Sequence, residues 1–148
     1  MADIVDQSTR SKMMARIGGK NTKPEMMVRK WLHRAGFRFR LHRKDLPGTP
    51  DIVLPKFKTV ILVHGCFWHR HPDCKLSYTP KSRESAWRKK FSENVRRDQK
   101  NIKDLSDLGW KVFIVWECET RNPEAFENRM NQIASSLNEQ PIPYNLQI

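Results

Sequence analysis

The chain has 148 residues, of which 28 are lysine or arginine and 16 are aspartate or glutamate, so its formal net charge is +12. This excess of cations favours a polyanionic partner that is bound through phosphate contacts and counterion release. No stretch approaches the ~20 apolar residues of a membrane span, and the polar, acidic N-terminus is unlike a signal peptide, so we expect a cytoplasmic, monomeric nucleic-acid-binding protein with one domain over residues 1–148.

The first 63 residues predict two helices followed by three strands. A short basic helix is expected over 8–17. A second helix begins at Thr22, where Thr-Lys-Pro-Glu reads as a capping box with proline in the first turn, and it stops at Gly36. Alternating apolar residues, and then a continuous apolar run, predict strands over 37–41, 51–54 and 59–63, the last of them buried on both faces.

The second half predicts a long loop, two helices and one more strand. Residues 64–82 form an irregular segment that is dense in histidine, cysteine and aromatic residues, and loops of this length are usually functional or tied down by a metal. A long helix over 83–108, a buried strand over 110–116, a helix over 123–137 and a loose tail over 138–148 follow. The order of elements predicts an α/β fold with a mixed sheet and helices on both faces.

Three cysteines and a histidine form the first candidate site. Zinc takes four soft or borderline ligands in a tetrahedron, and Cys66, His71, Cys74 and Cys118 supply such a set. In a reducing compartment an odd number of cysteines indicates metal binding or free thiols rather than disulfides. Buried apolar thiols fit poorly beside charged, histidine-rich sequence, so we expect a structural Zn²⁺ that pins the loop 64–82.

A carboxylate at the start of a strand is the second candidate. Asp51 follows the turn sequence Pro-Gly-Thr-Pro, and in this position it can hold a Mg²⁺ that polarises a scissile phosphate and acidifies a bound water. His64 and His69 can take a proton from that water or give one to a leaving oxygen. Two plainer interpretations stay open, in which Asp51 closes a turn and Glu25 acts only in the capping box instead of facing the metal through a water. No role is assigned to His33 or His42, which we treat as ordinary helix and strand residues.

Aromatic and basic side chains supply candidate contacts to nucleic acid. Apolar wedges between base pairs unstack a duplex, and a mismatch lowers the cost. The wedge candidates are Phe67 and Trp68, then Trp87, for which core packing is the open alternative, and then Met14. Basic side chains grip phosphates, so binding should weaken steeply with salt. The candidates for phosphate contacts are Arg10, Lys12, Lys89, Lys90, Arg96 and Arg97.

Four segments between about residues 3 and 118 carry a family resemblance. They are Thr9-Arg-Ser-Lys12, Leu46-Pro-Gly-Thr-Pro-Asp51, His64-Gly-Cys-Phe-Trp-His69 and Gly109-Trp-Lys-Val-Phe-Ile-Val-Trp-Glu-Cys118. These segments resemble the very-short-patch-repair mismatch endonucleases of bacteria. The third segment is highly specific to that family, and together with the fourth it is nearly diagnostic.

The resemblance implies a restriction-endonuclease-like core, in which helices flank a mixed central sheet and zinc pins a loop. It implies an endonuclease that nicks double-stranded DNA on the 5′ side of the thymine in T:G mismatches, which arise when 5-methylcytosine deaminates. A nucleoid-associated place in the bacterial cytoplasm and contact with general mismatch-repair proteins follow from the same resemblance.

The resemblance also assigns roles by position. It makes His69 the general base and His64 an assistant at the phosphate, and it gives residues 1–20 the role of a DNA clamp. The zinc ligands and the intercalating residues are those named above. The residues assigned to Mg²⁺ are Asp51 and the backbone carbonyl of Val63, with Glu25 helping to hold the hydrated metal.

Three departures from the family pattern bear on these roles. Residues 59–65 lack the acid-x-Lys motif of the wider nuclease superfamily, and Val63 stands where a threonine is expected. One added residue in the loop moves the third zinc ligand to Cys74, where Asp73 is a competing ligand. Two other functions stay open, namely a nuclease of the same fold with broader mismatch or restriction-type specificity, and a non-catalytic zinc-stabilised DNA-binding module.

Overall fold

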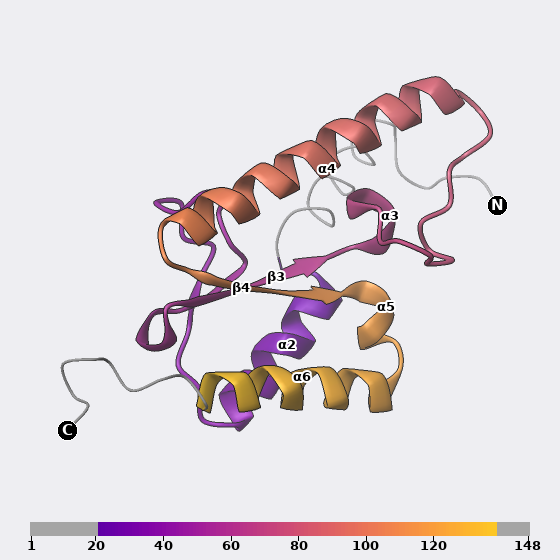
Figure 1. Cartoon of the computed structure of the whole chain (residues 1–148). Helices are drawn as coiled ribbons and strands as arrows, with labels where there is room; N and C mark the ends of the chain where they lie inside the picture. The colour runs from indigo at the N-terminus through magenta and orange to yellow at the C-terminus, as the bar shows by residue number, and fades with distance from the viewer. Residues whose placement is uncertain (1–20, 139–148) are drawn as a thin grey trace, which may run out of the picture.

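A computed structural model describes residues 21–138 of the chain, and it contains one four-stranded mixed sheet (Figure 1). β1 pairs antiparallel with β2, and β2 pairs antiparallel with β3, whereas β3 and β4 run parallel. The expected mixed sheet is therefore confirmed. In chain order the strands are β1 (Arg40–Leu41), β2 (Ile52–Leu54), β3 (Thr59–His64) and β4 (Lys111–Trp116).

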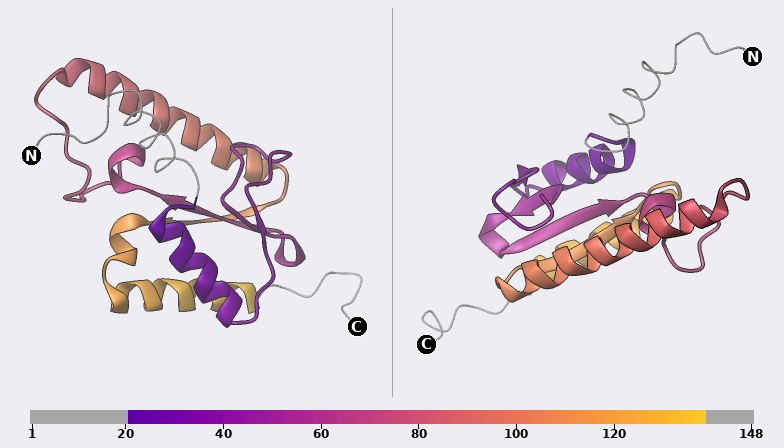
Figure 2. Two further views of the ribbon diagram at one scale, coloured as in Figure 1. Left: turned by 180° about the vertical axis from the view of Figure 1, so that it is seen from behind. Right: turned by 90° about the horizontal axis from the view of Figure 1, so that it is seen from above.

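Helices cover both faces of this sheet, as Figures 1 and 2 show. α2 and α6 contribute side chains to one core cluster, and α4 contributes to the other. Among the described residues, none of the helices has the length and apolar character that a bilayer crossing requires. The helices are α2 (Lys23–Arg34), α3 (Cys66–His69), α4 (Glu84–Asp107), α5 (Glu117–Thr120) and α6 (Pro123–Asn138), with a 3-10 turn, η1 (Pro55–Phe57), between β2 and β3.

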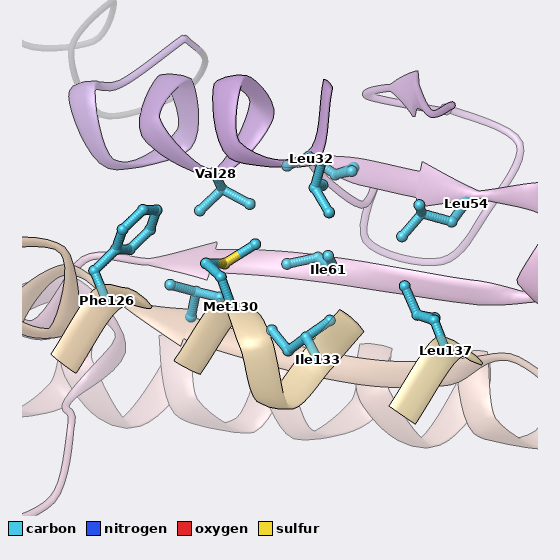
Figure 3. Packing of buried hydrophobic residues seen from close by; sticks show 10 residues of the cluster. Val28, Leu32, Leu54, Ile61, Phe126, Met130, Ile133 and Leu137 are labelled. Carbon is cyan, nitrogen blue, oxygen red and sulfur yellow. The ribbon is translucent and has the colours of Figure 1, made fainter. Parts of the chain in front are cut away.

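Alternation along the strands divides the core between the two faces. Successive strand side chains point to opposite faces, so Ile61 joins the cluster under α2 and α6 while Val60 joins the cluster under α4. Figure 3 shows Ile61 between Leu32 of α2 and Ile133 of α6. β3 is thus buried on both faces, which confirms the expectation for 59–63.

Two strand expectations are corrected. The segment 37–41 is paired only at Arg40–Leu41, which makes β1 a two-residue strand. β4 was expected to be buried, but it lies at an edge of the described sheet and only Val115 in it is fully buried. Arg129 of α6 packs against β4, because it donates to the carbonyl of Ile114 and lies 5.9 Å from the ring of Phe113.

Other differences concern short elements. The segment 64–82 is irregular as expected, except for the single helical turn of α3. A second single turn, α5, directly follows β4. The helix expected over 8–17 and the clamp over 1–20 lie outside the described residues, as does the tail beyond Asn138, which itself ends α6.

A glycine fixes the turn that leads into β2. Gly48 has φ +73, and a Cβ at this position would lie 2.7 Å from Nδ2 and 2.9 Å from Cβ of Asn101 on α4. A side chain would therefore meet both an unfavourable left-handed backbone and a close neighbour. The close approach of Gly48 to the side chain of Asn101 places the turn against the middle of α4.

We predict that Gly48→Ala lowers the free energy of unfolding by about 2–4 kcal/mol, because strain in the left-handed region and overpacking against Asn101 add together. Gly36→Ala is the matched control, since Gly36 has φ +88 with no atom within 4 Å, and it should cost only about 1 kcal/mol. Urea denaturation measures both. Equal losses in the two variants would contradict a steric role for Asn101, and recovery in Gly48→Ala/Asn101→Ala would support it.

Candidate active site

One cleft of about 1010 Å³ gathers all the residues that the sequence nominates for catalysis. Its walls come from the start of α2, the turn before β2, the end of β3, α3 and the middle of α4. The parallel and antiparallel partners of β3 position these segments at one end of the sheet. The nominated residues in the lining are Glu25, Asp51, Val63, His64 and His69.

Asp51 is fixed by the neighbouring strand. Its Oδ2 accepts a hydrogen bond of 2.8 Å from the backbone N–H of Val63 at the end of β3. Burial raises the pKa of Asp51 from 3.8 to about 6, and the bond from Val63 acts in the opposite direction. A bound cation would favour the ionised carboxylate, so this residue suits a metal ligand better than a solvated turn.

Glu25 serves the helix start only in part. Thr22 caps α2 as expected, because its Oγ1 accepts from the backbone N–H of Glu25 at 3.3 Å. The reciprocal half of the capping box is wrong, since the Glu25 carboxylate faces His42 and Arg29 instead. Both of its oxygens lie 3.1 Å from Nε2 of His42, and one lies 3.4 Å from Arg29. The side chain is 2 % exposed, so burial in the cleft decides its direction.

Two stacked histidines and an aspartate form the opposite wall. The rings of His64 and His69 lie 3.9 Å apart and nearly parallel, and Nδ1 of His69 lies 2.6 Å from Oδ2 of Asp98. A proton on Nδ1 donated to Asp98 leaves Nε2 of His69 able to accept one. Burial lowers the pKa of His64 to about 4, and His69 acts in the same direction, so His64 is neutral at neutral pH.

His42 and Asp98 are cleft residues that the sequence interpretation missed. Treating His42 as an ordinary strand residue is wrong, because it lies just beyond β1 with its ring against Glu25. The sequence spacing could have identified Asp98, because it lies seven residues from both Phe91 and Leu105, the two buried residues of α4, and so falls on the buried face of the helix. A carboxylate on the apolar stripe of a helix needs a partner inside the protein.

The four nominated zinc ligands converge beside this cleft. Their ligand atoms all lie within 4.8 Å of one another, with Nδ1 of His71 at 3.4 Å from Sγ of Cys118 and 3.7 Å from Sγ of Cys66. A tetrahedral ion with Zn–S of ~2.3 Å and Zn–N of ~2.1 Å separates such atoms by roughly 3.6 Å, so the residues fit. Cys74 completes the set, whereas Asp73 is exposed and lies outside it.

Strand register explains this convergence. His64 of β3 pairs with Trp116 of β4, so Cys66 and Cys118 each lie two residues beyond a paired position. The backbone N–H of Cys118 donates to Sγ of Cys66 at 3.4 Å. Burial raises the pKa of the Cys66 thiol to about 12, and a metal would hold this sulfur as the thiolate.

The nominated wedge residues form one aromatic cluster at the rim of the cleft. The ring of Phe67 lies 5.0 Å from Trp68, 5.6 Å from Trp87 and 5.1 Å from Phe91. Phe91 is buried, but the other three rings are half-buried, so Trp87 both packs in the cluster and keeps an accessible face. The nominated cations of α4, namely Lys89, Lys90, Arg96 and Arg97, are all exposed. The nominated residues Arg10, Lys12 and Met14 lie outside the described part of the chain.

Similarity to known proteins extends along most of the chain. The family model described as DNA mismatch endonuclease Vsr matches residues 2–76. The type II nicking enzyme V.XorIIP of Xanthomonas oryzae pv. oryzae is 47% identical over 90% of this chain and 97% of its own length, and V.NmeAIP of Neisseria meningitidis is 44% identical over 93% and 97%. The DNA mismatch endonuclease Vsr of Escherichia coli K12 is 44% identical over 84% and 79%. This chain belongs to the Vsr family of DNA mismatch endonucleases.

Proposed function

We propose that this protein is a Mg²⁺-dependent endonuclease that nicks the thymine strand of duplex DNA 5′ of the T in T:G mismatches left by deamination of 5-methylcytosine. One observation carries the proposal: a single cleft holds the half-buried carboxylate Asp51 opposite the His69–Asp98 pair. The names of the relatives, which are a mismatch endonuclease and nicking enzymes, point the same way. We also propose that the enzyme acts at the nucleoid in the cytoplasm, as a monomer that contacts general mismatch-repair proteins.

The cleft supports hydrolysis of a phosphodiester. Asp51 and the backbone carbonyl of Val63 would hold Mg²⁺, and Glu25 lies close enough to Asp51 to help through a water. Mg²⁺ held by these residues would polarise the scissile phosphate and stabilise the developing charge. His69 takes a proton from water at Nε2 while the water oxygen bonds to phosphorus and the bond to the leaving oxygen breaks. Neutral His64 hydrogen-bonds the phosphate.

Asp98 acts through His69 as a positioning residue. Its carboxylate accepts from Nδ1, which selects the tautomer that has a free Nε2 and fixes the plane of the ring. Stacking against His64 restricts the ring from its face. The base is therefore aligned before substrate binds, which lowers the cost of reaching a reactive geometry.

Aromatic and basic residues at the rim of the cleft recognise the mismatched DNA. Phe67, Trp68 and Trp87 form the wedge that enters the unstacked mismatch, with Met14 as a further contact. Nζ of Lys90 lies 5.1 Å from the centre of the Trp68 ring, so a proposed phosphate contact lies next to the proposed wedge. The remaining proposed phosphate contacts are Arg10, Lys12, Lys89, Arg96 and Arg97.

The nicking prediction uses end-labelled duplexes with a T:G mismatch in a cytosine-methyltransferase site, its C:G parent, and a T:G mismatch elsewhere. With Mg²⁺, we expect one nick beside the T in the first duplex only. Asp51→Ala should lose at least ~10³-fold in rate, since the metal ligand is removed. Asp45→Ala removes an exposed acid that pairs with Arg43, and it should retain full activity.

Other outcomes separate the alternatives. Nicking at every mismatch would keep the chemistry and overturn the T:G specificity. Mg²⁺-dependent cleavage of the matched parent would favour a restriction-type function. Tight binding to DNA without cleavage, unchanged by Asp51→Ala, would favour a zinc-stabilised binding module.

A second prediction concerns the positioning of His69. His69→Gln should lower kcat by about 10²–10⁴-fold, and Asp98→Asn should lower kcat with little change in KM. The double variant should be no worse than His69→Gln alone, because Asp98 acts only through that ring. Asp107→Asn, an exposed acid on the same helix, is the control. Losses that multiply in the double variant would show that Asp98 acts independently of His69.

We also propose that Cys66, His71, Cys74 and Cys118 hold a structural Zn²⁺. Metal analysis of purified protein should give about one zinc per chain, and Cys74→Ser or Cys118→Ser should lose it together with thermal stability. Asp73→Asn should keep the zinc. Retention in Cys74→Ser and loss in Asp73→Asn would make Asp73 the ligand instead.

A further inference from the structure

His42 lies against the two carboxylates at the base of the cleft. Its Nε2 is 3.1 Å from both carboxylate oxygens of Glu25. Ligand atoms of Glu25, His42 and Asp51 all lie within 4.8 Å of one another. An imidazole nitrogen therefore shares a small volume with two acidic groups.

The backbone holds His42 in this place. β1 pairs with β2, and just past the pair the N–H of His42 donates to the carbonyl of Asp51 at 3.1 Å. The φ of His42 is +48, a left-handed conformation that is uncommon for a residue other than glycine. The backbone of Asp51 thus directly fixes the residue that presents the imidazole, and the ring and the Asp51 carboxylate are positioned as a unit.

The spacing matches a coordination sphere. Neighbouring ligands of a six-coordinate ion with bonds of ~2.1 Å lie about 3 Å apart, which is the separation of Nε2 from the Glu25 oxygens. The Asp51 carboxylate uses Oδ2 for Val63, and among the described residues no hydrogen bond is found at its other oxygen. The His42 and Glu25 side chains are 14 % and 2 % exposed, so both are largely shielded from solvent.

We propose that His42 is a direct ligand of the divalent cation held at Asp51, with Glu25 as the third protein side chain of that site. The inference rests on the proposed function, which puts the cation at Asp51. Imidazole is a softer ligand than carboxylate or water. The site therefore binds Mn²⁺ and Co²⁺ more tightly, relative to Mg²⁺, than an all-oxygen site does.

Pulsed electron paramagnetic resonance on the zinc-loaded protein with one equivalent of Mn²⁺ tests the ligand directly. We expect nitrogen coupling to Mn²⁺ in the parent protein, and its loss in His42→Asn. Asparagine tolerates the left-handed backbone but is too short to reach the ion. The dissociation constant for Mn²⁺ from the same titration should rise about tenfold or more in this variant, as for other losses at metal sites, and the constant for Mg²⁺ should rise less.

His33→Asn is the matched control, because His33 is exposed near the end of α2 and should leave the coupling and both affinities unchanged. His69→Gln tests whether the coupling arises from the other wall of the cleft. Absence of nitrogen coupling in the parent protein would overturn the proposal whatever the variants do. Coupling that persists in His42→Asn with unchanged Mn²⁺ affinity would also overturn it, leaving His42 as a hydrogen-bond partner of Glu25.

Nicking activity keeps the two proposals apart. Specific nicking without His42 coordination would leave the proposed function intact and remove the ligand assignment. His42-dependent coupling in a protein that does not cut DNA would support the ligand assignment and overturn the proposed function.

Discussion

The pairing of β3 with its two neighbours is the constraint on which the site depends. The antiparallel register sets Ile52 against Ile61, which brings Asp51 beside the end of β3, where Val63 donates to it. The parallel register sets His64 against Trp116, which brings the wall of the cleft that holds His64 and His69 to the same end of the sheet as the cysteines. A slip of one residue would turn every side chain of β3 to the other face. The buried alternation on both faces opposes such a slip.

The proposed zinc ligands lie on the same segment as the proposed base and the proposed wedge residues. Cys66 begins α3, and His69 ends it, so a ligand of the cluster and the proposed base belong to one helical turn. His71 stacks on Trp116 at 4.2 Å, which ties the loop to β4. Arg70 also ties the loop together and to α4, since it donates to the carbonyls of Ser77 and Tyr78 and lies 3.9 Å from the Phe91 ring. A polar loop with little core of its own is thereby held in one conformation.

The cleft concentrates ionisable groups in a way that costs stability. Glu25 and His64 are buried, and burial raises the pKa of Asp51 to about 6 and lowers that of His64 to about 4. Buried groups with perturbed pKa values are typical of functional sites. A divalent cation at the proposed site would offset the repulsion between the acids, and DNA would bring negative charge to a protein with a net charge of +12. The perturbed groups of the cleft therefore suit the proposed ligands better than the free protein.

The sequence by itself determined the elements and most members of the site. Apolar periodicity located α2, α4 and α6, because each buries one face, and a continuous apolar run located β3, because it is buried on both faces. Local motifs nominated Asp51, His64, His69 and the four sulfur and nitrogen ligands, because these residues stand in short, distinctive segments. Only the tertiary structure decided how far β1 pairs, that β4 lies at an edge, and that the Glu25 carboxylate turns from its cap toward His42. His42 and Asp98 enter the site through contacts with residues 17 and 29 positions away, and no local pattern encodes which distant side chain a buried charge will meet.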